Sequence, residues 1–178
     1  MIEGQVGNPP ESYLKTILPL IEVARGLLEK GEQLAPIAFV GNFATGKTAQ
    51  VLLESGSDAE KDRSALAIRM TADMLDADFV FVIMEAWSLR KDKMAQMDAI
   101  LDKYGSIGAS PYRVDVVSFG LETRYGVWMS QCEIKPKGIS KKKRTIGTPA
   151  FQYFKEVAGR FTHLLKKNPQ GEDGATLH

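Results

Sequence analysis

Apolar side chains recur at helical spacing in several parts of the chain and predict its helices. The spacing predicts four amphipathic helices, over about residues 11–31, 58–76, 92–104 and 149–167. The second follows Ser57-Asp58-Ala59-Glu60, which has the form of a capping box because the serine oxygen can accept from the Glu60 amide. The methionines of these predicted helices fall on helical stripes and are interpreted as core residues. Pro19 predicts a kink or a restart in the first helix.

Shorter apolar runs predict the strands. Ile37–Val40 follows a proline and is expected to be buried. Residues 78–85, DFVFVIME, are apolar on both faces, which is typical of the most buried strand of a sheet. Residues 114–122 and 125–134 are separated by only Thr123-Arg124, so a tight antiparallel hairpin is expected there.

Together these elements predict a single α+β domain over residues 11–167, with a mostly antiparallel sheet and the order α-β-β-α-β-α-β-β-α. The helices over 58–76 and 149–167 are expected to pack on the sheet. The first helix is expected to cover an edge of the sheet or to form a partner surface. Residues 1–10 are expected to be a flexible lead-in and residues 168–178 a disordered tail.

The composition of the 178-residue chain fits one globular domain, because 44% of its residues are hydrophobic and 25% are charged. A formal net charge of +1 argues against a protein that binds nucleic acid with its whole surface. The lone cysteine, Cys132, fits a reducing compartment. No secretory signal is visible at the start, and the apolar run 79–84 is far shorter than the roughly 20 residues of a membrane helix. We therefore expect a soluble cytoplasmic protein without a membrane partner.

Residues 41–48, GNFATGKT, match the pattern G-x-x-x-x-G-K-[ST] at every defined position. The segment resembles the phosphate-binding loop, or Walker A motif, of P-loop nucleoside triphosphatases. In that family the loop amides surround the phosphates of ATP or GTP, the lysine contacts the β- and γ-phosphates, and the hydroxyl holds Mg²⁺. Glu85, at the end of an apolar strand, would be a loose substitute for the Walker B acid. The resemblance thus implies a nucleotide site formed by Gly41, Gly46, Lys47 and Thr48.

The surrounding sequence favours a different structure for this segment. A phosphate-binding loop precedes a helix whose N-terminal amides face the phosphate, whereas only residues 48–54 separate GNFATGKT from the next capping box. Their alternation fits a strand apart from Leu52, and a helical fit stays open. P-loop folds also need a parallel sheet built from repeated β–α units, and this sequence predicts only two strands of the buried kind found in such sheets. We therefore interpret Ile37–Gly41 and Thr48–Leu53 as a β-hairpin turned through residues 44–47, with a nucleotide site as the alternative.

The order of elements from about residue 25 to 135 is similar to that of uncharacterised bacterial α+β proteins. The similarity rests on a proline-led strand, a turn with glycine, a strand, a helix and a buried strand that ends in Glu85-Ala86-Trp87. In those proteins the central strand likewise ends near Glu-Ala-Trp, and a hairpin with a variable tip precedes the helix. The resemblance implies a fold and no activity.

The positive charge of the chain is concentrated in one predicted loop. Six cations lie within ten residues, namely Lys135, Lys137, Lys141, Lys142, Lys143 and Arg144. Subtracting these six from the net charge of +1 leaves −5 for the rest of the chain. Such a cluster suits contact with phosphate groups or another anionic partner, and a solvated hairpin loop is the alternative. No aromatic residue interleaves with the lysines, so the loop itself does not predict a base-stacking surface.

Two carboxylates at predicted strand ends are candidates for acid–base chemistry. Such a pair can act if burial or mutual repulsion separates the two pKa values. No histidine lies near either in sequence, so ion pairs such as Glu85–Arg124 or Glu122–Arg113 are the favoured interpretation. If the strand ends meet, the cleft they form would be lined by Glu85, Trp87, Glu122 and Arg124.

The sequence predicts no catalytic or metal site. Cys132, His163 and His178 are far apart, and the motifs G-x-S-x-G, C-x-x-C and H-E-x-x-H are absent. We therefore expect a non-enzymatic accessory or binding protein of bacterial or phage origin that acts through a macromolecular partner or as a homo-oligomer. Nucleic acid is one candidate partner of residues 135–144. The alternative is a small P-loop enzyme that binds ATP or GTP with Mg²⁺ through residues 41–48.

Overall fold

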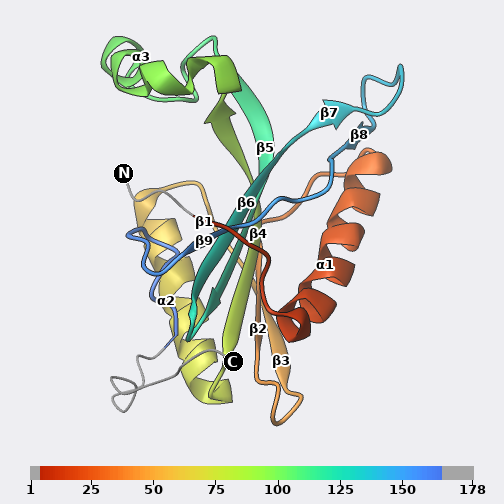
Figure 1. Ribbon diagram of the computed structural model, residues 1–178, viewed down its shortest axis with the longest axis vertical. Coiled ribbons are helices and arrows are strands. Elements are labelled where there is room, and N and C mark those ends of the chain that lie inside the picture. The colour runs from red at the N-terminus through yellow and green to blue at the C-terminus, as the bar shows by residue number, and fades with distance from the viewer. Residues whose placement is uncertain (1–4, 166–178) are drawn as a thin grey trace.

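The computed structural model describes residues 5–165 and has a seven-stranded sheet at its centre (Figure 1). The strands lie in the order β1-β9-β6-β5-β4-β2-β3, and each neighbouring pair is antiparallel. Their bounds are β1 (Gln5–Val6), β2 (Ile37–Gly41), β3 (Thr48–Leu52), β4 (Phe79–Leu89), β5 (Arg113–Thr123), β6 (Gly126–Glu133) and β9 (Gln152–Phe154). The prediction of an α+β domain with a mostly antiparallel sheet is confirmed.

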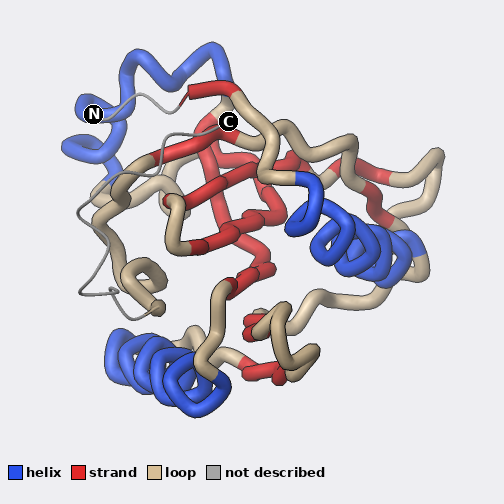
Figure 2. Tube along the Cα trace, turned by 60° about the horizontal axis from the view of Figure 1, so that its bottom comes forward, coloured by secondary structure: helices blue, strands red, loops and turns tan. Residues whose placement is uncertain are grey.

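Two long helices, α1 (Glu11–Glu29) and α2 (Asp58–Leu75), cover opposite faces of this sheet (Figure 2). The alternation of β4 explains how one strand serves both layers. Phe79, Phe81 and Ile83 face α1, while Val80 and Val82 face α2. The expectation that the first helix covers an edge is wrong. Its buried stripe packs on the aromatic centre of the sheet and comprises Tyr13, Ile17, Ile21, Ala24 and Leu28.

The capping box of α2 is formed as predicted, but the helix does not bury its methionines. The Ser57 hydroxyl accepts from the Glu60 amide at 3.2 Å, and the Glu60 carboxylate accepts from the Ser57 amide at 2.6 Å. The buried positions are Ser64, Ala65, Ile68 and Ala72. Met70 and Met74 are 57% and 84% exposed, so their interpretation as core residues is wrong. Small side chains on the buried face let α2 lie close to the sheet.

The segment after GNFATGKT is a strand. Thr48 is aligned with Gly41 and Leu52 with Ile37, which makes β2 and β3 an antiparallel hairpin. The predicted hairpin is therefore present, with residues 42–47 as its loop.

Strands β4 and β5 are longer than predicted and continue past the end of β2, the other neighbour of β4 in the sheet. Strand β2 ends its pairing at Ile83, whereas β4 and β5 remain paired as far as Leu89 and Arg113. At their tip lie η1 (Lys91–Gln96) and α3 (Met97–Tyr104), in the region where a short helix was expected. We call residues 86–115 the arm, which projects from one end of the sheet in Figure 1.

The predicted last helix does not form over the described residues 149–165. Instead, β9 pairs with β6 and with β1, and residues 155–165 are irregular. The apolar residues that suggested one helical stripe belong to two layers, because Phe151 packs on the α1 side and Phe161 on the α2 side. No single helix can reach both faces of a sheet. Gln5–Val6, within the expected flexible lead-in, is an edge strand, and the expected tail 168–178 lies outside the described residues.

Candidate functional site

Several backbone amides of the GNFATGKT loop are hydrogen-bonded to other groups of the protein. The Asn42 amide donates to the Lys47 carbonyl at 2.9 Å and closes the loop. The Phe43 amide donates to the Asp78 carboxylate at 3.1 and 3.3 Å, and the Thr45 amide donates to Asn42 Oδ1 at 3.1 Å. In a P-loop, by contrast, successive backbone amides of the loop point at the phosphate rather than at groups of the same protein.

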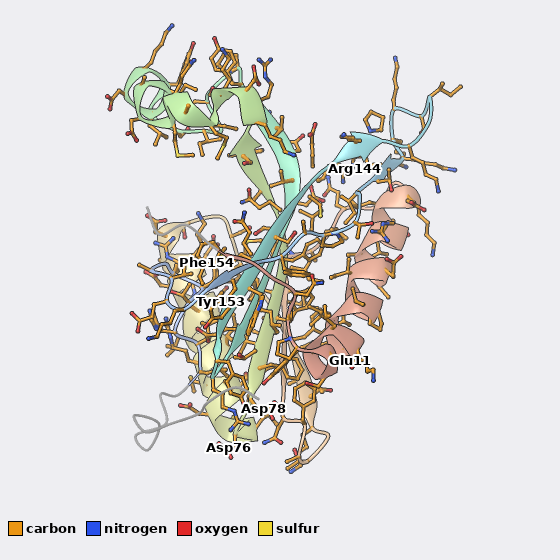
Figure 3. The ribbon with its side chains drawn as sticks, in the orientation of Figure 1. Glu11, Asp76, Asp78, Arg144, Tyr153 and Phe154 are labelled. Atoms are coloured by element: carbon orange, nitrogen blue, oxygen red, sulfur yellow. The ribbon has the colours of Figure 1, made fainter. Side chains whose placement is uncertain are left out.

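The electrostatic surroundings of this loop also differ from those of a phosphate site. The Asn42 side chain donates to the carbonyls of Leu75 and Asp76 at 3.2 and 2.6 Å, at the C-terminal end of α2. A helix C-terminus carries partial negative charge, and Asp78 adds a carboxylate (Figure 3). Lys47 and Thr48 are both exposed, and no helix N-terminus follows them. The geometry favours a structural role for the loop, and binding of ATP or GTP remains the alternative for experiment.

The structure does not bring the four predicted cleft residues together. Glu85 and Trp87 continue the β4 alternation that faces α1, whereas Glu122 faces the opposite side of the sheet. Arg124 lies in the β5–β6 turn, beside the start of β4, while Trp87 is near the end of β4. Neither predicted ion pair forms.

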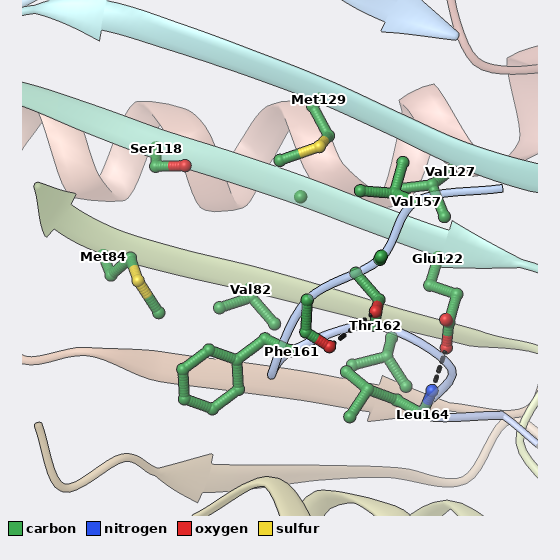
Figure 4. A pocket seen from close by; sticks show the side chains of 14 residues that line it. Val82, Met84, Ser118, Glu122, Val127, Met129, Val157, Phe161, Thr162 and Leu164 are labelled. Carbon is green, nitrogen blue, oxygen red and sulfur yellow. Dashed lines mark hydrogen bonds between the residues drawn. The ribbon is translucent and has the colours of Figure 1, made fainter. Parts of the chain in front are cut away.

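Glu122 instead lies at one end of a cavity of about 220 Å³ on the α2 side (Figure 4). Its floor comes from β4, β5 and β6, and its roof from the irregular residues 157–164. Oε2 of Glu122 accepts from the amides of Leu164 and Leu165 at 2.7 and 2.8 Å. Burial raises the pKa of this carboxyl, and the amide bonds oppose that rise more weakly. Among the described residues no second titratable side chain lines this cavity, so the Glu122 carboxyl fastens residues 164–165 rather than forming a catalytic pair.

Glu85 anchors the basic segment. Its carboxylate pairs with the Arg144 guanidinium at 3.2 and 3.3 Å and also accepts from the Leu34 amide at 3.2 Å. Glu29, the last residue of α1, accepts from Lys137 Nζ and Thr145 Oγ1, each at 2.8 Å. Both bonds lower the pKa of the Glu29 carboxyl. These contacts attach the segment to the end of α1 and to β4.

The anchored segment is an antiparallel ribbon, β7 (Lys135–Pro136) and β8 (Arg144–Thr145), that projects from the body in Figure 1. We call residues 135–144 the basic ribbon. Ile139 at its tip is fully exposed. Two of its six cations are engaged by Glu29 and Glu85. Four are exposed and make no ion pair with any other described residue, namely Lys135, Lys141, Lys142 and Lys143.

Trp87 lies beside the base of this ribbon. It is aligned with Asp115, whose carbonyl accepts from the Ile134 amide at 2.8 Å, directly before the ribbon begins. Sequence reasoning grouped Trp87 with other residues because the pairing of β4 was unknown. The predicted hairpin is present, but it turns through Arg124 and Tyr125 rather than Thr123-Arg124, and this register sets Asp115 beside the start of the ribbon.

The described part of the chain offers little support for other classes of site. Over residues 5–165 no three His, Cys, Asp or Glu side chains are arranged to hold a metal ion. Burial raises the pKa of the Cys132 thiol, which disfavours the reactive thiolate. None of the helices in that range combines the length and apolar character needed to cross a bilayer. Comparisons with protein-family models, curated proteins and solved structures found no match to this chain.

Proposed function

We propose that this protein binds an anionic macromolecule through the basic ribbon and acts as a non-catalytic accessory protein. The observation that carries the proposal is a set of four exposed lysines that have no acidic partner within residues 5–165, on a ribbon whose base is tied to the body. Adjacent like charges repel one another, so a run such as Lys141–Lys143 lowers stability unless an anion offsets it. Phosphate groups would do so, with release of their counterions.

The anchoring of the ribbon supports the same conclusion. Glu29 and Glu85 fix its two strands near their base. Because the ribbon is already partly ordered before it binds, binding loses less conformational entropy. The remainder of the chain carries a formal charge of −5 and repels polyanions. A polyanion is therefore directed to one end of the molecule, which favours an oriented contact over a diffuse one.

Salt-dependent binding tests this proposal. Fluorescence anisotropy would follow labelled single- and double-stranded DNA, with heparin as competitor, from low to physiological salt. Replacing Lys141, Lys142 and Lys143 with serine should reduce the slope of log K against log salt by about 2, because roughly 0.7 counterions are released per single-strand phosphate contact.

A matched variant separates this effect from a general loss of charge. Changing the exposed residues Lys15, Lys47 and Lys155 to serine removes the same charge outside the ribbon and should leave the slope almost unchanged. Circular dichroism would confirm that both variants fold. The proposal is refuted if the wild-type protein binds no polyanion at low salt, or if the two variants lose affinity equally.

A further inference from the structure

We infer that the anionic partner is a single-stranded nucleic acid, with a base stacked on Trp87 and the neighbouring phosphates on the basic ribbon. This inference rests on the proposed function and names the class of its partner. Trp87 is 55% exposed although tryptophan is the largest apolar side chain, and it lies on the same face of β4 as Glu85, which holds Arg144.

The Trp87 ring is held in place by Arg113 and Gly108, and the residue remains 55% exposed. The Arg113 guanidinium lies 5.1 Å from the ring centre and donates to the Gly108 carbonyl at 2.9 Å. The ring also touches Gly108 so closely that a Cβ there would lie 2.4 Å from it. A fixed, half-exposed aromatic ring is the element on which successive bases of single strands stack in sequence-tolerant binding.

The spacing of the cations fits a strand that lies across this ring. Glu85 and Trp87 are two residues apart on one strand face, about 7 Å along the strand. The first residue of the ribbon, Lys135, follows Ile134, whose amide is bonded to the residue opposite Trp87. One nucleic-acid strand can therefore place a base on the ring and phosphates at the ribbon. The bases of a duplex are already stacked on one another, and an acidic polypeptide supplies no regular series of planar rings.

The arm contains further contacts between cationic side chains and an aromatic ring. Tyr112, directly before Arg113, lies 4.9 Å from Lys93 Nζ and 5.5 Å from the Arg90 guanidinium. One exposed acid opposes phosphate here, since Asp115 lies opposite Trp87. Removing the Asp115 charge should therefore raise the affinity for a nucleic acid, and this increase can be measured.

The two tryptophans of the chain allow a direct measurement, because Trp128 is only 6% exposed. The full chain would be titrated with thymidine or uridine oligonucleotides of about 20 nucleotides, longer than a single site of this kind. A duplex of equal length, heparin and polyglutamate complete the set. Single strands should quench tryptophan emission, and a Trp128→Phe variant should retain the quenching. The ratio of the thymidine and uridine affinities tells whether DNA or RNA is preferred, and either preference supports the inference.

Substitutions then separate stacking from charge. Trp87→Ala should weaken single-strand binding about 10-fold or more and leave heparin binding unchanged, with Trp87→Phe intermediate. Asp115→Asn should tighten binding by about 2- to 3-fold. Equal affinity for duplex and single strand without quenching would overturn this inference and leave the proposed function standing. The inference is likewise overturned, and the proposed function left standing, if polyglutamate binds as tightly as single strands and Trp87→Ala has no effect. If no polyanion binds, both are overturned.

Discussion

At the residue scale, Asn42 determines the structure of the loop that resembles a Walker A motif. Its side chain donates to two carbonyls at the end of α2 and accepts from the Thr45 amide. The motif leaves this position undefined, so the pattern gave no sign of its role. Asp78 likewise looks like an ordinary surface acid in the sequence, yet its carboxylate accepts a hydrogen bond from the Phe43 amide. The motif could be recognised from the sequence, but not the groups that already bind its amides.

We predict that Asn42→Ala lowers the free energy of unfolding by about 2 kcal/mol, because the substitution removes a buried side chain that makes three hydrogen bonds. Lys47→Ala should change it by less than about 0.5 kcal/mol, since the side chain is exposed. Urea denaturation at equilibrium measures both. Calorimetric titration with Mg²⁺ and a non-hydrolysable ATP or GTP analogue should show no heat. Saturable binding that Lys47→Ala abolishes would restore the nucleotide site.

At the element scale, the local hydrophobic pattern predicted most helices and strands correctly. It failed where a segment carries two apolar stripes and packing decides which of them is buried. Helix α2 carries one stripe with Leu66, Met70 and Met74 and another with Ile68 and Ala72. Hydrophobicity favours the first because its side chains are larger. The structure buries the second, because small residues allow close contact with β2 and β3. The last helix failed for a related reason, since its apolar residues serve different faces of the sheet.

We predict that Ile68→Ala costs about 3 kcal/mol of stability, as expected for a fully buried aliphatic side chain. Met74→Ala, on the exposed stripe of the same helix, should cost less than about 0.5 kcal/mol. Midpoints of guanidinium unfolding compare the two variants directly. Comparable losses would mean that the Met74 stripe is covered in solution, by a second copy of the chain or by the undescribed residues.

At the scale of the whole molecule, the sequence established the class of fold but not the order of its strands. The short loops allowed the two hairpins to be derived, because each joins strands that are neighbours in sequence. The placement of β4 between β2 and β5, and of β9 beside β6, depends on contacts between distant segments. For the same reason the sequence singled out both the cations and Trp87 but did not place them in one site.

The buried Glu122 carboxyl should make global stability depend on pH. Its pKa is raised by burial, so the folded protein keeps this proton to a higher pH than the unfolded chain does. The stabilising contribution is complete below the unfolded pKa and is lost as the pH rises through the folded pKa. We expect the free energy of unfolding of the wild-type protein to fall relative to Glu122→Gln as the pH rises from the ordinary carboxyl pKa through the raised pKa of folded Glu122.

Paired denaturation curves at several pH values would measure this difference. Parallel pH profiles for the two proteins would show that the carboxyl titrates normally and that the segment above it is loosely held. His163→Gln, at an exposed neighbouring position, serves as the control for a general effect of charge on that segment.

The pairing of β1 with β9 has a consequence for how the protein is made. Gln5 and Val6 are translated before the rest of the described chain, yet their partners Tyr153 and Gln152 emerge from the ribosome only after nearly all of it. Loop closure over such a separation is slow, and this edge of the sheet has to be completed after synthesis of the rest. Until then β6 presents an unpaired edge, so the nascent chain passes through a stage in which chaperones or strands of other molecules can reach it.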